Sequence, residues 1–226
     1  MLYKPDFKNA YIKANELLVS STLFSSFPVD IKAVIKELSD IKLITYEKAL
    51  SFGINVKAFG SDDAQLVEKN GRYIIFYNSK VSKERQNFSI SHEFDHYILC
   101  HKTMEILDDA LKPFSQEIYE KQELETNFCT AQVFMPEQII REFRRRGKNV
   151  NSDFLMKYFG VSRQAAEQRL ETLQKVNSSR LSPEQRYFDD IILRQAKKFI
   201  DRIAPEWDFY DFEKEEAKQM ERDSWY

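Results

Sequence analysis

The chain has 226 residues, of which 42% are apolar and 31% are charged, the composition of an ordinary globular protein. A net charge of −2 excludes a general electrostatic attraction to nucleic acid or anionic lipid, so such contacts would need a local basic patch. Two cysteines are too few for a disulfide framework, and the sequence shows neither a signal-peptide pattern nor an apolar run of about 18 residues. We therefore expect a cytoplasmic protein that has no contact with the membrane.

The first predicted elements are two helices and a strand. Apolar residues at helical spacing predict a helix over residues 7–24. A second helix is expected to open at Pro28, because proline suits the first position of a helix. The run IKLITY at residues 41–46 predicts a short strand. The N-terminal part is therefore expected to combine helices with a small amount of sheet.

A β-hairpin and a longer helix are expected next. Asn70-Gly71 favours a type I′ turn, so residues 64–78 predict a hairpin. If its second strand, residues 72–78, lies at a sheet edge, an extended polypeptide can pair with it. The alternative is a strand with two buried faces and no such contact. Ser82 is suited to cap a helix that runs to about residue 100.

The helix after Ser82 contains the motif H-E-x-x-H, formed by His92-Glu93-Phe94-Asp95-His96. Residues i and i+4 lie about 40° apart around a helix, so both imidazoles project from one face and can bind one ion. Glu93 lies about 100° from His92, where its carboxylate can reach a water at that ion without being a ligand. We interpret the motif as a zincin-like metal site with Glu93 as general base. The alternative is a half-buried helix whose histidines only form hydrogen bonds.

A catalytic zinc site usually has three protein ligands and one open position for water, so a third ligand is required. The extended motif with a glycine and a third histidine does not fit, because Leu99 stands in place of the glycine and His101 comes one residue early. In a continuous helix His101 would also lie about 140° from the face of His96. We therefore expect His101 behind a ligand or at the rim of the site.

A helix predicted over residues 116–134, which Pro136 ends or redirects, offers the third ligand. Glu123 and Asn127 are spaced i and i+4 and share one face of that helix. Glu123 is therefore the expected metal ligand, and Asn127 is expected to form a hydrogen bond to a liganding histidine from behind. Glu125 lacks such a pairing. The alternative is that both glutamates are solvated surface charges.

The C-terminal half has a different composition. Residues 141–148 form a basic cluster, and residues 152–173 predict two short helices joined at Gly160-Val161-Ser162, with the spacing of a helix-turn-helix. Sequence-specific DNA binding is therefore a competing hypothesis. We do not favour it, because Glu167 and Glu171 accompany Arg163 and Arg169 and make the second helix mixed in charge.

Three regions are expected along the chain. They are a catalytic core over residues 1–137, a helix-turn-helix-like subdomain over 138–178 and a helical tail over 179–226. The end of the tail is acidic and unusually aromatic for a solvating segment. Its aromatic residues are expected to dock onto the body of the protein, and they are Trp207, Phe209, Tyr210, Phe212, Trp225 and Tyr226.

Three segments together resemble the ImmA/IrrE family of metallopeptidases: residues 72–99, which include the H-E-x-x-H motif, residues 125–136 (ETNFCTAQVFMP) and residues 159–170 (FGVSRQAAEQRL). The resemblance runs from about residue 28 to residue 176. It implies that His92, His96 and Glu123 are metal ligands and that Glu93 is the catalytic acid and base.

The sequence departs from the family pattern at two places. Asp95 replaces the usual glycine, and Thr126-Asn127-Phe128-Cys129 replaces the more usual Ala-Asn-x-Phe. Asp95 is expected either to perturb the site or to bind a histidine from outside. Neither departure removes a ligand, so an active enzyme is still expected.

The predicted fold class is α+β, with a mostly helical zincin-like core, a small sheet or hairpin and a helix-turn-helix-like C-terminal part. The expected cofactor is Zn²⁺, with Mn²⁺ as an alternative. The resemblance implies a metallo-endopeptidase whose protein substrate is a helix-turn-helix repressor, in a mobile genetic element or a stress response. Tyr97 and Tyr119 are candidate oxyanion donors, although tyrosines beside a core helix more often serve packing. The alternatives are a DNA-binding or protein-binding regulator and a metal-binding interaction protein, both without catalysis.

Overall fold

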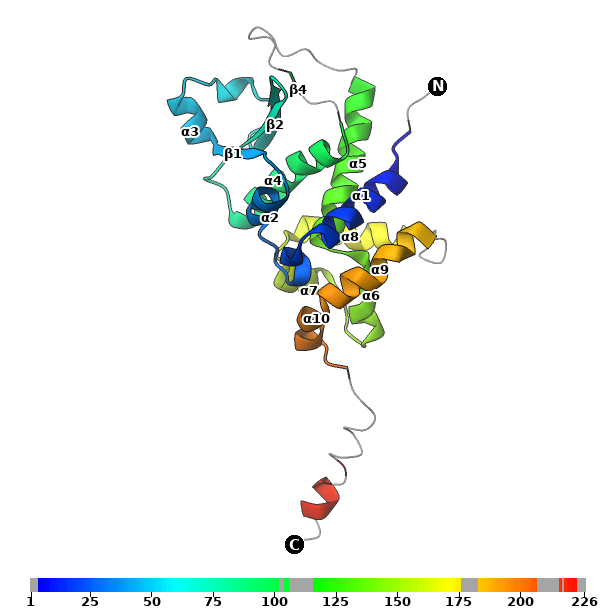
Figure 1. Ribbon diagram of the computed structural model, residues 1–226. Helices are drawn as coiled ribbons and strands as arrows, with labels where there is room; N and C mark the ends of the chain where they lie inside the picture. The colour runs from blue at the N-terminus through cyan, green and yellow to red at the C-terminus, as the bar shows by residue number, and fades with distance from the viewer. Residues whose placement is uncertain are drawn as a thin grey trace.

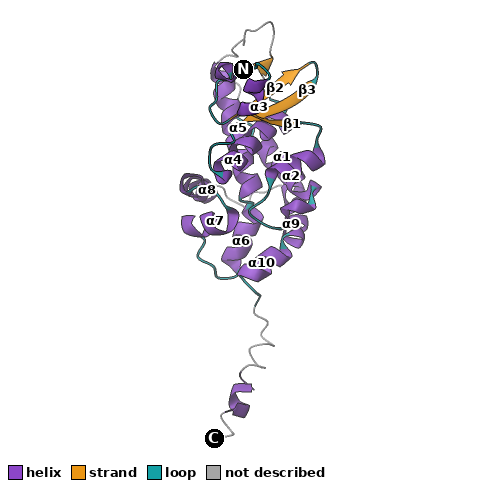
Figure 2. Cartoon of the chain, turned by 90° about the vertical axis from the view of Figure 1, so that its left-hand side faces the viewer, coloured by secondary structure: helices purple, strands orange, loops and turns teal. Residues whose placement is uncertain are grey.

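The computed structural model describes residues 4–101, 104–105, 116–175, 183–206, 216 and 218–222 (Figure 1). Most of these residues are helical, and one small sheet lies toward one end of the molecule, as Figure 2 shows. This architecture confirms the predicted α+β class with a helical C-terminal part. Within the residues that the structure describes, no helix is both long and apolar enough to cross a membrane.

The sheet contains strands in the order β1-β3-β2-β4, which are Lys42–Thr45, Arg72–Tyr77, Ala64–Lys69 and Met104–Glu105. β3 is parallel to β1 on one side and antiparallel to β2 on the other, so both of its edges are occupied. Of the two alternatives for residues 72–78, an edge strand open to a polypeptide is therefore wrong. β2 has β3 on one side, and on its other side it pairs with the short strand β4 at Val67 and Glu68.

β2 and β3 form the predicted hairpin. Its turn residues, Asn70 and Gly71, have φ angles of 53° and 71°. A type I′ turn requires positive φ at both central positions, which asparagine and glycine tolerate best. The dipeptide thus fixes the register of the strand that borders the site described below.

The N-terminal helices are α1 (Phe7–Ser20), the short 3-10 turn η1 (Thr22–Ser25) and α2 (Ile31–Leu38), and α3 (Tyr46–Ser51) and η2 (Val56–Ala58) follow β1. The predicted start of the second helix at Pro28 is wrong by three residues. Asp30 caps this helix, since its carboxylate accepts the backbone N–H groups of Lys32 and Ala33. Aspartate satisfies these otherwise unpaired donors, which proline cannot do, so the helix begins at Ile31.

The two central helices are α4 (Lys83–Ile98) and α5 (Gln116–Phe134). Ser82 caps α4 as predicted, because its hydroxyl accepts the N–H of Arg85. The buried side chains of Ile90 and Phe94 join α4 to the main core, and α4 contacts both β2 and α5. The H-E-x-x-H motif therefore lies between the sheet and the helix that contains Glu123.

The remaining helices are α6 (Glu137–Arg145), α7 (Ser152–Phe159), α8 (Arg163–Lys175), α9 (Pro183–Gln195) and α10 (Lys197–Ile203). Pro136 separates α5 from α6 as predicted, and α7 and α8 confirm the predicted pair of short helices. Gly160 ends α7 in the left-handed conformation, with φ of 65°. A Cβ atom at Gly160 would lie 2.6 Å from Cγ of Pro28, so glycine is also needed for this close approach.

The arginines of the basic cluster form ion pairs with acids of the last helices. Arg141 lies 2.7 Å from Asp189, and Arg146 lies 2.7 Å from Asp201 and 2.6 Å from Glu142. These contacts fasten α6 to α9 and α10. Three of the cluster's arginines, including Arg145 beside Glu142, are therefore structural partners of carboxylates rather than unpaired charges facing a nucleic acid.

The helix-turn-helix-like pair is also less basic at its surface than its sequence suggests. Arg169 of α8 is buried, and its Nε donates to the backbone oxygen of Met135 at the end of α5. Its guanidinium also donates to Gln132. The interpretation of Arg169 as part of a mixed surface is therefore wrong, and the residue instead anchors α8 to the end of α5.

The main hydrophobic core includes residues from Ala10 to Ala204. It joins all three expected regions through contacts such as that of Phe27 with Phe159 and Phe199, whose ring centroids lie 5.1 Å and 5.4 Å from it. The division at residues 137 and 178 stays a prediction. The aromatic tail residues Trp207, Phe209, Tyr210, Phe212, Trp225 and Tyr226 lie outside the described residues.

Candidate metal centre

α4 presents its two motif histidines toward α5. The Nε2 atoms of His92 and His96 lie 3.1 Å apart, and the rings meet edge to face. This arrangement follows from the helical spacing, since one turn separates the two residues. Both rings are partly buried, so their paired nitrogens face a sheltered space rather than bulk solvent.

Glu123 of α5 completes a group of three candidate ligands. Its two carboxylate oxygens lie 3.2 Å from Nε2 of His92 and 3.2 Å from Nε2 of His96. One ligand atom from each residue can be chosen so that all three lie within 4.8 Å of one another. Two imidazole nitrogens and a carboxylate are a donor set that catalytic zinc sites use, so these residues fit a divalent ion of that class.

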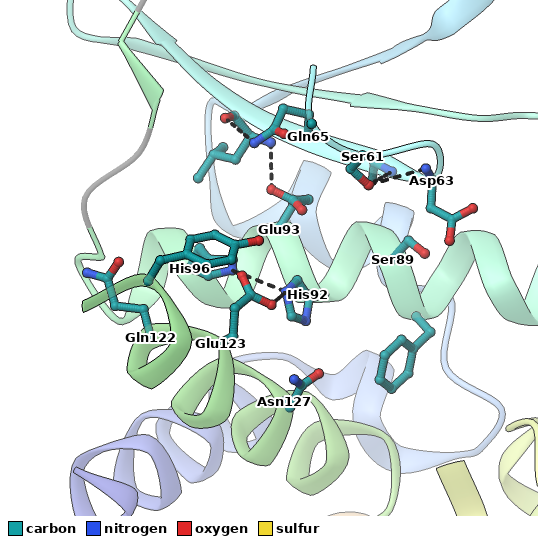
Figure 3. A pocket seen from close by; sticks show the side chains of 15 residues that line it. Ser61, Asp63, Gln65, Ser89, His92, Glu93, His96, Gln122, Glu123 and Asn127 are labelled. Atoms are coloured by element: carbon teal, nitrogen blue, oxygen red, sulfur yellow. Dashed lines mark hydrogen bonds and ion pairs between the residues drawn. The ribbon is translucent and has the colours of Figure 1, made fainter. Parts of the chain in front are cut away.

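The two carboxylates of the site lie on opposite sides of the histidine pair. Figure 3 shows Glu123 on the α5 side and Glu93 on the side of β2. The Oε2 atom of Glu93 accepts the backbone N–H of Leu66 at 2.6 Å. Glu93 is thereby fixed by the sheet and stays apart from the group of candidate ligands, as a general base requires.

The environment gives these two carboxyl groups opposite acidities. Burial raises the pKa of Glu93 to about 7, although the charge of His92 and the hydrogen bond from Leu66 oppose the shift. Burial also acts to raise the pKa of Glu123, but its hydrogen bonds to His92 and His96 outweigh that effect and hold the pKa well below its usual value. Glu123 is thus a stable anion, whereas Glu93 can exchange a proton near neutral pH.

Asn127 is placed beside the site but not in the predicted role. It lines the cavity, yet within the described part of the chain it forms no hydrogen bond with either histidine. The neighbouring residue, Thr126, takes that place instead, with its hydroxyl oxygen 3.3 Å from Nδ1 of His96. Glu123 and Asn127 share one face of α5, as expected, and both line the cavity. The orientation of α5 about its axis nevertheless places Thr126, and not Asn127, behind His96.

His101 lies behind a candidate ligand, one of the two positions expected for it. Its Nδ1 is 3.0 Å from Nδ1 of His96, and its Nε2 is 2.8 Å from Oε2 of Glu125. Glu125 is only 3% exposed and also accepts the backbone N–H of Asp6 at 2.6 Å. The alternative that Glu125 is a solvated surface charge is therefore wrong. No periodic signal links His101 to Glu125, because they come from different elements.

Asp95 does not bind a histidine from outside. It is fully buried between α4 and α5, where Oδ2 accepts the hydroxyl of Thr130 at 2.5 Å and that of Ser91 at 3.4 Å. Burial raises the pKa of Asp95 to about 7. The residue that replaces the family's glycine is thus part of the packing between the two helices that hold the site.

The two tyrosines named as oxyanion donors lie in different places. Tyr119 lines the cavity, and burial together with the charge of Glu123 raises its pKa to about 12. Tyr97 packs against Tyr73, with ring centroids 4.9 Å apart, and is absent from the residues that line the cavity. Tyr97 is therefore a packing residue, and Tyr119 is the tyrosine near the candidate ligands.

The candidate ligands and Glu93 line a cavity of about 360 Å³ between β2, α4 and α5 (Figure 3). A larger groove of about 850 Å³ adjoins it, because Phe88 and Asn127 line both spaces. The groove lies between α1, α5 and α8, and its apolar lining includes Phe7, Tyr11, Leu124, Phe128, Ala131 and Leu173. The site thus adjoins a larger groove whose lining is mostly apolar.

A family model described as Peptidase_M78, IrrE N-terminal-like domain, matches residues 49–171, which is more than half of the chain. The chain belongs to the Peptidase_M78 family. The match includes α4, α5 and all four residues of the candidate centre. Membership supports a function of the metallopeptidase type, and it confirms the resemblance drawn from the sequence. A comparison with curated proteins found no match.

Proposed function

We propose that the protein is a zinc-dependent metallo-endopeptidase in which His92, His96 and Glu123 hold the ion and Glu93 is the general base. The observation that carries this proposal is the convergence of three ligand atoms within 4.8 Å, next to a carboxylate that is fixed by a backbone N–H. The arrangement places four polar side chains around one cavity. Packing between two helices does not require such a cluster, whereas a catalytic metal site does.

In the proposed hydrolysis of a peptide bond, each residue of the site has a separate role. When bound, the ion supplies a polarised water and neutralises charge that develops on the peptide carbonyl oxygen. Glu93 accepts a proton from the attacking water and delivers it to the leaving amine, because its carboxylate lines the same cavity as the two histidines without being a ligand. Tyr119 is the residue that we place as hydrogen-bond donor to the developing oxyanion, since it lines the same cavity.

The substrate proposed here is a polypeptide longer than the cavity itself. The adjoining apolar groove supports a substrate that continues beyond the cleaved bond. The backbone N–H of Leu66 on β2 donates to Glu93 and is therefore not available to a substrate strand. The proposal accordingly does not require the substrate to pair with β2 at Leu66. A helix-turn-helix repressor as the substrate rests on the family resemblance. DNA binding ranks lower, because Arg141 and Arg146 are paired and Arg169 is buried.

The decisive experiment compares metal content with cleavage. Purified protein should contain about one equivalent of zinc or a similar divalent ion, and His92→Ala should abolish it. Glu93→Gln should keep the ion but lower the cleavage of a co-expressed helix-turn-helix repressor by about 100-fold or more. Cleavage is scored on a gel as a shortened repressor.

Glu117→Gln is the matched control, because Glu117 lies on the exposed start of α5 and pairs with Lys121 rather than with the site. It should leave both metal content and cleavage unchanged. Cleavage by Glu93→Gln at the rate of the unmodified protein would remove the proposed role of Glu93. Absence of any bound divalent ion from the unmodified protein would remove the metal centre itself.

A further inference from the structure

We propose that His101 and Glu125 are positioning residues that hold His96 in the one tautomer able to bind a metal through Nε2. This inference rests on the proposed metal centre and adds residues that do not touch the ion. A neutral imidazole has one N–H and one lone pair, so the partner of its outer nitrogen decides which nitrogen is left to bind. The contacts behind His96 determine that choice.

The first step fixes the proton of His101. Glu125 is almost fully buried, and its Oε1 accepts the backbone N–H of Asp6 at 2.6 Å. Its Oε2 lies 2.8 Å from Nε2 of His101. A carboxylate can only accept, so the hydrogen of this contact belongs to Nε2 of His101. The Nδ1 atom of neutral His101 is then left with its lone pair.

The second step fixes the proton of His96. Its Nδ1 lies 3.0 Å from the lone pair on Nδ1 of His101, a hydrogen-bonding distance that requires a donor. Nδ1 of His96 therefore bears the hydrogen, and Nε2 bears the lone pair. That lone pair faces Nε2 of His92 at 3.1 Å, which can donate to it, so the contact of the same nitrogen with Oε1 of Glu123 at 3.2 Å needs no hydrogen from His96. The chain from Glu125 to His96 thus ends on a nitrogen ready to bind a cation.

The hydroxyl of Thr126 lies beside the Nδ1 atoms of both histidines. Its hydroxyl donates to the backbone oxygen of Gln122 at 2.8 Å, so the oxygen is left as an acceptor. That oxygen lies 3.3 Å from Nδ1 of His96 and 3.1 Å from Nδ1 of His101, so it can share the hydrogen that His96 donates to His101. His92 differs, because its Nδ1 has no hydrogen-bond partner among the residues described here. The positioning is therefore specific to one of the two histidines.

The first test measures zinc affinity by competition with a chelator. His101→Leu removes the acceptor and should weaken zinc binding by about 10- to 100-fold. His101→Asn, whose amide oxygen can occupy the place of Nδ1, should restore part of that loss. Thr126→Val removes the hydroxyl beside both Nδ1 atoms but keeps the acceptor on His101, so it should have a smaller effect than His101→Leu. Glu120→Gln, on the exposed face of α5, is the control and should bind zinc normally.

The second test reads the tautomer directly in metal-free protein. Long-range ¹H–¹⁵N spectra should show the hydrogen of His96 on Nδ1. In Glu125→Gln the new amide can donate to His101 and reverse its tautomer, so the hydrogen of His96 should move toward Nε2. A purely structural role of Glu125 would lower the melting temperature without this change. The spectra also keep the inference testable should His101→Leu fail to fold.

Two results would overturn the inference: normal zinc affinity in His101→Leu, or an unchanged tautomer of His96 in Glu125→Gln. Either result would leave the metallopeptidase proposal intact, because the three candidate ligands would still bind. Failure of that proposal looks different, since the unmodified protein would then bind no zinc at all. Weakened binding that asparagine partly rescues, together with a shifted tautomer, would establish the positioning role.

Discussion

At the scale of single residues, the two acidic side chains of the site show how surroundings assign roles to chemically similar groups. Glu93 is half-buried beside one backbone donor, and desolvation raises its pKa to about 7. Glu123 lies between two imidazoles, which hold its pKa well below its usual value. One carboxylate is therefore suited to binding a cation and the other to moving a proton. Pairs of titratable groups driven apart in this way are typical of acid–base enzymes.

Tyr119→Phe tests the proposed oxyanion donor. Loss of the hydroxyl should lower the turnover rate by about 10- to 100-fold with little change in metal content, because the hydrogen bond strengthens mainly in the transition state. Repressor cleavage and zinc content are measured on the same preparations. Tyr97→Phe is the matched control, since that ring packs against Tyr73 away from the cavity. Equal losses in the two variants would remove the role of Tyr119.

At the scale of elements, sequence patterns predicted those features that depend on local spacing. The Asn70-Gly71 turn, the cap at Ser82 and the end of α5 at Pro136 all follow from neighbouring residues. The start of α2 was misplaced because Asp30 supplies a better cap than Pro28 does. The internal position of β3 could not be predicted, because it depends on pairing with β1, which lies about 30 residues earlier in the chain.

Gly160→Ala tests the contact between the α7–α8 turn and Pro28. The new Cβ would lie 2.6 Å from Pro28 and the residue would keep a positive φ, so the free energy of unfolding should fall sharply. Gly147→Ala is the control, because its φ is also positive but nothing lies within 4 Å of the added atom. The control should cost about 1–2 kcal/mol and Gly160→Ala about 1–3 kcal/mol more.

Both glycine variants are measured by urea unfolding. If Gly160→Ala lowers the free energy of unfolding no more than Gly147→Ala does, the turn can move away from Pro28 without an energetic cost. In that case the packing of the helix-turn-helix-like pair against the N-terminal half would be looser than the distance indicates.

Glu142→Gln tests the ion pairs at the end of α6 that hold Arg146, which in turn pairs with Asp201 of α10. Hydrogen bonds from Arg145 and Arg146 lower the pKa of Glu142 to about 2, so its contribution to stability is present above its usual pKa of about 4.5 and is lost as the pH falls toward 2. The substitution should therefore cost about 1–2 kcal/mol at pH 7 and progressively less below about pH 4. Unfolding in urea at pH 7, 4 and 3 measures the difference.

The control for this pH dependence is Glu167→Gln, since Glu167 is exposed on α8. It should change the free energy of unfolding very little at each pH. A cost of Glu142→Gln that stays constant from pH 7 to pH 3 would mean that lost packing, rather than lost charge, causes the destabilisation.

At the scale of the whole molecule, the candidate centre joins parts that are far apart in sequence. The spacing of His92, Glu93 and His96 predicted their common face, and i, i+4 spacing selected Glu123. Spacing could not predict that Thr126, rather than Asn127, lies behind His96, since that depends on how α5 is rotated against α4. It also could not predict the buried link from Glu125 to His101, because the two residues belong to separate elements.

Zinc should raise the thermal stability of the whole protein, because the candidate ligands connect α4 with α5. At a free zinc concentration 100 times Kd, binding adds about 2.7 kcal/mol to the free energy of unfolding, which corresponds to roughly 5–11 °C in melting temperature. Differential scanning calorimetry with zinc and with a chelator measures the shift. His92→Ala should melt at one temperature under both conditions, and a shift that persists in this variant would place the stabilising ion elsewhere.

The hydrogen bond from the backbone of Asp6 to Glu125 spans 119 positions and lies outside the set of residues that line the cavity. A cleavage, fusion or extension that displaces the backbone ahead of α1 would remove a donor from Glu125 and thereby loosen the support behind His96. Versions of the protein that differ only near residue 6 are therefore not equivalent reagents for metal-binding work.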